Sequence, residues 1–159
     1  MKRNLCAKFA TGDIIIHMDD DNYYPASSVM TRVKAVSMKK PCVGCTEINN
    51  FYPKKMISFK SQLQSRKSIE QQTCMSTLAY PKQFWEKQKF DNQDIDNEGI
   101  VFFKGRGGKI KEIDVNGIVV VLLHKGNYVP YPEIVKGEAN GWHFGEIDST
   151  LFEFIGKVE

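Results

Sequence analysis

Residues 2–25 read KRNLCAKFATGDIIIHMDDDNYYP, and the expected fold depends mainly on this stretch. The β-branched run DIIIHM at 13–18 has the length of a strand, and its unbroken apolarity predicts a strand that is covered on both faces. Asp19, Asp20 and Asp21 follow directly. These carboxylates repel one another, and each would lose stability if it were buried without a partner. The sequence therefore predicts that something compensates the three charges.

A short helix is expected on either side of this strand. Residues 2–10 place Leu5 and Phe9 on one face, and Gly12 is positioned to end the helix. Pro25 suits the first turn of a second helix, in which three valines repeat at helical spacing. These are Val29, Val33 and Val36.

Strands and helices alternate along the rest of the chain. Strands are expected at 42–48, 55–59, 75–80, 109–115 and 117–124, with short helices from Pro81 (carrying Phe84 and Trp85) and at 99–105, where Gly105 ends the helix. Residues 60–73 are polar and predict a loop or an exposed segment, and 128–159 predict a carboxy-terminal packing segment. The alternation indicates an α/β domain, in which ligands gather at the carboxyl ends of strands. The aspartates occupy such an end.

Length and composition indicate one ordinary globular domain, residues 1–159. The net charge of +3 is too small, and its basic residues too dispersed, to indicate binding of nucleic acid or of a membrane surface. The longest apolar run, at 118–123, is far too short to span a membrane. No charged-then-apolar leader begins the chain, so we expect a cytoplasmic location.

The four cysteines do not form a recognisable metal or redox motif. Cys42 and Cys45 are close together, but Cys6 and Cys74 stand alone and supply no second ligand pair for zinc. A redox pair would be expected at the start of a helix after a strand, which this segment does not suggest. We therefore expect buried, reduced, structural thiols.

The aspartates suggest a divalent cation. If the extended geometry continues past the strand, Asp19 and Asp21 lie on the same side, where they could hold Mg²⁺ or Mn²⁺ together with water and the phosphates of a substrate. The alternative is an acidic turn that is simply solvated. An EF-hand loop starting at Asp19 is excluded, because its sixth and twelfth positions are Tyr24 and Met30 instead of Gly and Glu.

A phosphohydrolase with an aspartyl nucleophile also places Asp-x-Asp after a strand. Tyr23 stands where such enzymes have a small Thr or Val, and no later Gly-Asp pair supplies a second metal site. We keep a metal-dependent phosphohydrolase as a further alternative.

Residues 2–25 resemble the core of the GT-A fold glycosyltransferases, especially the family-2-like group. The pattern of that family runs Lys-Arg-Asn, a short helix, Ala-x-Gly-Asp/Glu, an apolar strand, an Asp-rich DxD and an aromatic residue before Pro. The positions in register are Ala10, Gly12, Asp13, Asp19, Asp21, Tyr23, Tyr24 and Pro25. The later segments TLAYPKQFW (77–85), DNEGIVFF (96–103) and VVVLLHKGN (119–127) resemble the acceptor-side helix region, the acidic helix start and the late strand of the family, in that order. The resemblance covers about residues 2–127.

The resemblance implies a GT-A-like (Rossmann-like) mixed sheet flanked by helices and a sugar transfer from a nucleoside-diphosphate donor to a hydroxyl of an acceptor glycan or protein. Asp19 and Asp21 would hold Mn²⁺ or Mg²⁺ against the diphosphate, and His124 would complete the metal shell. The ion would stabilise the negative charge of the leaving diphosphate. Members of the family carry further strands before this motif, so we expect a fold truncated at its amino-terminal side, and a partner chain could supply the missing half.

The resemblance also places residues around the nucleotide-sugar: Lys2, Arg3, Asp19, Asp20 and Trp85. By charge, Lys2 and Arg3 suit a phosphate, although residues so near the start of the chain can also fray. Trp85 could stack on a sugar or belong to the core. His17 points from the strand interior and is expected to be a core histidine with its hydrogen bonds satisfied.

An inverting transferase needs a carboxylate that takes the proton of the acceptor hydroxyl. The family usually supplies it from the second position of a Glu-Asp pair, but the aligned pair here is Glu98 and Gly99. Glu98 or Asp96 could serve instead, and retaining chemistry stays open. Glu98 could also be only a favourable residue at a helix start. A non-catalytic remnant or partner subunit of such an enzyme is therefore the second hypothesis.

Overall fold

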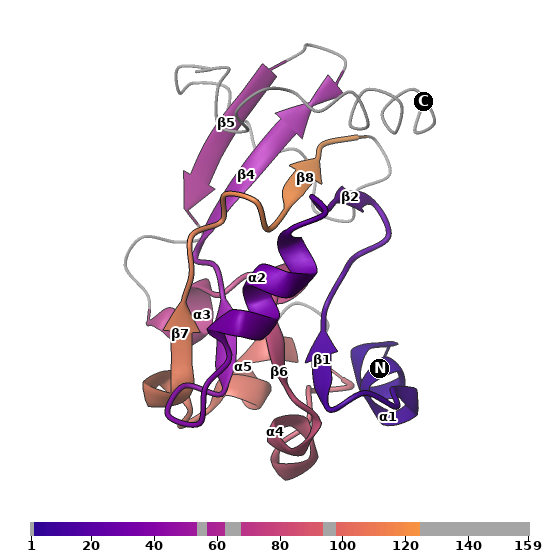
Figure 1. Cartoon of the computed structure of the whole chain (residues 1–159), viewed down its shortest axis with the longest axis vertical. Helices are drawn as coiled ribbons and strands as arrows, with labels where there is room; N and C mark the ends of the chain where they lie inside the picture. The colour runs from indigo at the N-terminus through magenta and orange to yellow at the C-terminus, as the bar shows by residue number, and fades with distance from the viewer. Residues whose placement is uncertain (1, 54–56, 63–67, 94–97, 125–159) are drawn as a thin grey trace.

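The computed structural model describes residues 2–53, 57–62, 68–93 and 98–124, and Figure 1 shows their arrangement. These residues form two four-stranded sheets, both mixed, with short helices around them. The predicted α/β class is thereby confirmed. The expected packing segment at 128–159 lies outside the described residues. No helix within these ranges is long and apolar enough to cross a lipid bilayer.

The first sheet contains the strand that leads into the aspartates. Its order is β1 (Ile14–Ile16), β6 (Ala79–Pro81), β3 (Cys42–Gly44) and β7 (Ile110–Glu112). β6 runs antiparallel to both of its neighbours, and β3 runs parallel to β7. β1 is thus an edge strand of this sheet within the described part of the chain.

The second sheet lies beyond the end of the first sheet at which β1 finishes, as Figure 1 shows. Its order is β2 (Asn22–Tyr23), β8 (Val120–Leu122), β4 (Glu47–Tyr52) and β5 (Ile57–Gln62). β4 is parallel to β8 and antiparallel to β5, while β2 is antiparallel to β8. The chain passes from the first sheet to the second between β1 and β2 and again between β3 and β4, as Figure 1 shows. The aspartates therefore lie where the chain crosses between the sheets.

The helices are short. They are α1 (Lys2–Phe9), α2 (Ser28–Ala35), α3 (Ile69–Gln72), α4 (Lys82–Lys87) and α5 (Glu98–Phe103), with 3₁₀ turns η2 (Met75–Thr77) and η3 (Gly107–Lys109). α2 packs against β1 and β3. Gly105 lies just after α5 with φ +71°, a left-handed conformation that favours glycine at the end of a helix. The predicted end of this helix is confirmed.

The main core is aromatic and lies between the first sheet, α4 and α5. It is formed by Ala7, Ile15, Cys42, Leu78, Tyr80, Phe84, Trp85, Phe90, Phe102, Phe103 and Ile110. The rings of Phe90 and Phe102 are stacked with their centroids 4.0 Å apart. Burial of each such side chain contributes roughly 2–3 kcal/mol. The expected helix after Pro81, with Phe84 and Trp85 on it, is confirmed as part of this core.

Several boundaries differ from the expected ones. The strand expected at 75–80 begins only at Ala79, because residues 75–77 form a 3₁₀ turn. The segment expected as a loop at 60–73 includes the end of β5 and the short helix α3. β1 is shorter than expected, and of its three residues only Ile15 is buried, so the prediction of complete cover on both faces is wrong.

The cysteines are free thiols. Cys42 and Cys45 are buried, and burial raises the pKa of each to about 12, as expected for structural thiols. Cys74 is half-buried. Cys6 is exposed, so the prediction of a buried thiol is wrong there: the opposite side of α1 faces the core, through Ala7.

Polar side chains take a large part in the buried faces of α1 and α2, and the predicted apolar side chains do not. In α1, Leu5 is 44% and Phe9 72% exposed, while Asn4 is buried. In α2, the buried residues are Ser28 and Arg32, and the valine stripe is not the buried face. Periodicity fails here because these polar groups are buried with hydrogen-bond partners from distant parts of the chain.

Arg32 is fully buried and joins three elements. Its Nη1 donates to the carbonyl of His17 at 2.7 Å and to that of Ser76 at 3.5 Å, and its Nη2 donates to Ser28 Oγ at 2.9 Å. The guanidinium also lies 5.5 Å from the centre of the Tyr24 ring. Burial lowers its pKa, because the charged form loses solvation. Arg32 thus fixes α2 and η2 against the segment that leads from β1 to the aspartates.

We predict that Arg32→Met destabilises the fold by about 3 kcal/mol, because the carbonyls and hydroxyl that it serves stay buried without their donor. The measurement is urea unfolding followed by circular dichroism. Lys34→Met, at an exposed position of the same helix, is the matched control and should change stability by less than about 0.5 kcal/mol. Equal effects of the two substitutions would show that the Arg32 contacts contribute little.

Candidate functional site

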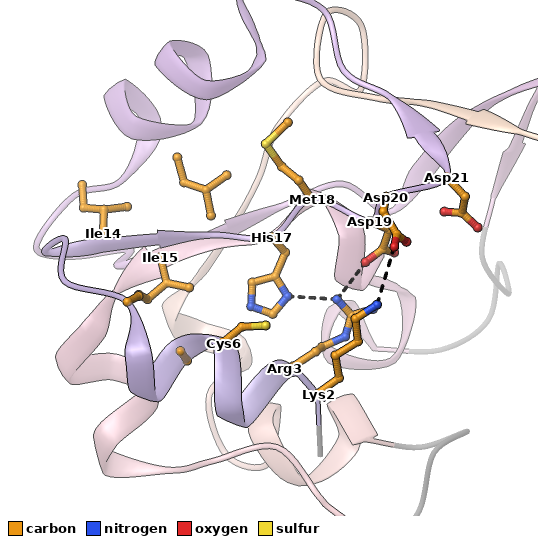
Figure 2. A pocket seen from close by; sticks show the side chains of 13 residues that line it. Lys2, Arg3, Cys6, Ile14, Ile15, His17, Met18, Asp19, Asp20 and Asp21 are labelled. Atoms are coloured by element: carbon orange, nitrogen blue, oxygen red, sulfur yellow. Dashed lines mark hydrogen bonds and ion pairs between the residues drawn. The ribbon is translucent and has the colours of Figure 1, made fainter. Parts of the chain in front are cut away.

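The aspartates form a turn at the end of β1. Asp20 and Asp21 occupy the turn, and the backbone N–H of Asn22 reaches back to the carbonyl of Asp19 at 3.5 Å. Figure 2 shows Asp19 and Asp20 near Arg3 and Lys2, with Asp21 apart from them. The extended geometry therefore does not continue, and the expectation that it places Asp19 and Asp21 on one side is wrong.

Each aspartate lies near a basic side chain of the protein. Arg3 Nη1 donates to Asp19 Oδ1 at 3.1 Å. Lys2 Nζ lies 3.8 Å from Asp20 Oδ2, and both side chains are more than 80% exposed. Exposed pairs of this kind contribute little, at most about 1 kcal/mol, whereas the less exposed Arg3 pair is screened less by solvent. α1 carries both cations and therefore compensates part of the negative charge of the aspartates.

His124 approaches the third aspartate from the other sheet. It follows β8, and its Nε2 lies 3.9 Å from Asp21 Oδ2. This imidazole is a cation only when protonated; when neutral, it can bind a metal through one ring nitrogen. The structure thus brings together two of the predicted metal ligands, Asp21 and His124, while the third, Asp19, is bonded to Arg3.

Tyr24 holds the backbone of the turn. Its hydroxyl accepts the N–H of Asp19 at 2.8 Å and donates to the carbonyl of Ser76 at 3.4 Å. Burial raises the pKa of Tyr24 and keeps the phenol protonated, so it can serve as donor and acceptor together. The aromatic residue after the aspartates therefore has a defined local role.

His17 lies beneath Arg3 and is 7% exposed. Its Nδ1 is 3.2 Å from Arg3 Nη1, and its Nε2 is 2.6 Å from the hydroxyl of Tyr80. Burial, followed by the charges of Arg3 and Arg32, lowers its pKa to about 3. The expectation of a core histidine with satisfied hydrogen bonds is confirmed.

Asn4 fixes the position of α1. Its amide nitrogen donates to the carbonyl of Phe90 at 2.9 Å and to Asn92 Oδ1 at 2.7 Å. Its Oδ1 accepts the indole N–H of Trp85 at 2.8 Å and the backbone N–H of Phe90 at 3.1 Å. Sequence reasoning did not identify this role, although Asn4 belongs to the Lys-Arg-Asn pattern. An asparagine within a short helix, where its intrinsic propensity is poor, was the available signal.

A cavity of about 900 Å³ lies between α1, β1 and the aspartate turn. Its residues are Lys2, Arg3, Cys6, Ala7, Ala10, Ile14, Ile15, Ile16, His17, Met18, Asp19, Asp20 and Asp21. Figure 2 shows the charged side chains at one end and the isoleucines of β1 at the other. The volume suits a small ligand, and the lining suits one that has a charged part and an apolar or ring-shaped part.

Trp85 does not belong to this cavity. It is buried in the aromatic core, and its indole N–H is bonded to Asn4. A tryptophan buried in this way cannot stack on a sugar in the cavity, so the predicted binding role is wrong. The alternative, that Trp85 belongs to the core, is correct. The physical reason is that α4 packs against β6 and places Trp85 in the core.

The side chains of the two candidate bases lie outside what the structure describes. Glu98 begins α5, but its carboxylate and the whole of Asp96 lie outside the described residues, so their role stays a prediction. Gly99 is buried, and a Cβ there would come within 2.5 Å of the Met75 side chain. The backbone of Gly99 thus packs tightly against Met75, at the position where the family pattern has aspartate.

The residues fit a divalent metal in part. Carboxylate oxygen and imidazole nitrogen are suitable ligands for Mn²⁺, which can take its remaining ligands from water and phosphates. Asp21 and His124 would need only a small approach to share an ion. However, the described ranges contain no group of three His, Cys, Asp or Glu side chains placed to hold one. Asp19 would have to exchange Arg3 for the metal.

Comparisons of the chain with protein-family models, curated proteins and solved structures find no match. The candidate site is therefore interpreted from its residues and from the resemblance of the motifs.

The lowered pKa of the buried His17 predicts that the folding stability depends on pH. Its pKa is depressed on folding, so the stability that it contributes is complete above about pH 6.5 and is lost as the pH falls toward 3. Between pH 7.5 and 4.5, urea unfolding should show a loss of roughly 3 kcal/mol from this group. His17→Gln should reduce the pH dependence by that amount, and parallel pH profiles of the two proteins would contradict the prediction.

Proposed function

We propose that this chain is a metal-dependent glycosyltransferase of the GT-A type, or the catalytic part of one. It would move a sugar from a nucleoside-diphosphate donor to the hydroxyl of an acceptor. The observation that carries the proposal is the aspartate turn at the mouth of the cavity, with Arg3 beside Asp19 and His124 beside Asp21. Acidic metal ligands and basic phosphate ligands are both needed to hold a metal–diphosphate pair.

In this proposal Asp21 and His124 would hold Mn²⁺ or Mg²⁺, and Asp19 would turn from Arg3 to join them. The ion, when bound, acts as a Lewis acid for the leaving diphosphate. Arg3 and Lys2 bind phosphate oxygens, and Tyr24 keeps the Asp19 backbone in place. Glu98 or Asp96 takes the proton of the acceptor hydroxyl.

The position of β1 supports the GT-A assignment. The resemblance implies further strands on the amino-terminal side of the strand that ends in the aspartates. β1 lies at the edge of its sheet within the described residues, where such strands could pair. They would cover the half-buried Ile14 and Ile16.

The same edge favours a second candidate function, a non-catalytic partner subunit or remnant of such an enzyme. An edge strand presents backbone N–H and C=O groups to an incoming strand. A chain that completes its sheet with another polypeptide could keep the fold without turnover. Gly99, in place of the expected base, is consistent with this candidate.

Calorimetric titration with UDP and GDP, with and without Mn²⁺, tests the two candidates. The transferase proposal predicts binding that requires the metal. Absence of binding to the folded chain under both conditions would contradict it and favour the partner subunit.

Asp21→Asn should abolish the metal-dependent nucleotide binding, because it removes one ligand charge with almost no change in volume. The control is Asp114→Asn, an exposed carboxylate that does not line the cavity. Circular dichroism should show the same fold for both variants. Unchanged nucleotide affinity in Asp21→Asn would remove this residue from the proposed metal site.

A further inference from the structure

His17 lies between two hydrogen-bonding groups, one in the core and one at the cavity. On the core side its Nε2 is 2.6 Å from the hydroxyl of Tyr80, which is fully buried in β6. On the cavity side its Nδ1 is 3.2 Å from Arg3 Nη1. The same Nη1 donates to Asp19 Oδ1 at 3.1 Å. A continuous chain of hydrogen bonds therefore runs from the core to the aspartate turn.

The chemistry of arginine assigns the roles in this chain. A guanidinium has only donors, so Nδ1 of His17 must be the acceptor and must carry no proton. In a neutral imidazole, Nε2 then carries the proton and donates to the oxygen of Tyr80. The ring is buried and fixed by its contacts, including edge-to-face packing on Tyr80 at 5.4 Å between centroids. The acceptor offered to Arg3 is thus rigid.

We propose that His17 is a positioning residue, whose Nδ1 holds the Arg3 guanidinium at the cavity mouth so that it binds the diphosphate of the donor. The ligand in this inference rests on the proposed function. If a diphosphate and a metal ion were bound, Asp19 would turn to the ion and a phosphate would replace Asp19 as the anionic partner of Arg3. The bond to His17 is kept throughout, so Arg3 needs no new support.

The rigid acceptor is useful because arginine has a long, flexible side chain. Arg3 is near the start of α1, and in this proposal the ligand would take the Asp19 carboxylate away from its guanidinium. A guanidinium that is held in advance loses less conformational freedom when it binds phosphate. In this proposal the contribution of His17 to binding acts through Arg3.

A double-mutant cycle tests this dependence. The measurement is the affinity for UDP in the presence of Mn²⁺, by calorimetry. His17→Leu should weaken binding about tenfold and Arg3→Gln roughly thirtyfold, as expected for the loss of a hydrogen-bonded charged group. The double variant should bind no more weakly than Arg3→Gln, because the effect of His17 is already lost. Fully additive effects would overturn the proposal.

Two further variants separate positioning from general damage. His17→Gln offers an amide oxygen to Arg3 and should restore the affinity to within about threefold of the wild type. Lys8→Gln removes an equal charge from an exposed position of α1 that does not line the cavity, and should leave the affinity unchanged. Failure of His17→Gln to improve on His17→Leu would contradict the acceptor role.

The tautomer of His17 can be measured without any nucleotide. In ¹⁵N NMR spectra of the ligand-free chain, we expect an unprotonated Nδ1 and a protonated Nε2, with a shift of the Nδ1 signal in Arg3→Gln. The opposite tautomer would overturn the inference, even if UDP binds. If the predicted tautomer is found and the wild type does not bind UDP with Mn²⁺, the proposed function fails, and the diphosphate role of Arg3 fails with it.

Discussion

The four hydrogen bonds of the buried Asn4 amide set the geometry on which the candidate site depends. They attach α1 to Trp85 and to the segment at 90–92, which lie more than 80 residues further along the chain. A buried amide is tolerated only when its donors and acceptors are satisfied, so α1 has little freedom to shift. Arg3, one residue before, consequently reaches both His17 and Asp19. The apolar side chains of α1 contribute less, because Leu5 and Phe9 face outward.

The charges around the aspartate turn are balanced by separate parts of the chain. α1 supplies Lys2 and Arg3, the end of β8 supplies His124, and α2 places the buried Arg32 behind the turn. Because Asp19 and Asp20 already have cationic partners, a cation would enter at Asp19 only by exchange, with Asp19 leaving Arg3 for the cation and an arriving anion taking its place beside Arg3. This coupling favours a ligand that carries both signs of charge, such as a metal–diphosphate pair, over a bare metal ion or a free phosphate.

Local pattern was sufficient for the strand that leads into the aspartates, for the helix with Phe84 and Trp85, and for the end of α5 at Gly105. Each of these depends on residues within one short window. It was insufficient for Asn4 and Arg32, because their burial depends on partners that only the tertiary fold supplies. The strand was expected to continue through the aspartates, with an acidic turn as the alternative, and the turn is what forms. Nothing in the sequence distinguishes a continued strand from a turn closed by Asn22. Within the site, pattern indicated the core role of His17. The metal-binding roles of Asp21 and His124 stay predictions, and the resemblance misplaced Trp85 at the ligand.

A crystal structure of the chain with Mn²⁺ and UDP would test the exchange of partners most directly. The expected result is an anomalous Mn²⁺ signal between Asp21 and His124, with Asp19 turned to the ion and Arg3 bonded to the diphosphate while it keeps His17. An ion bound elsewhere, or a bound nucleotide that leaves the Arg3–Asp19 pair unchanged, would contradict the account.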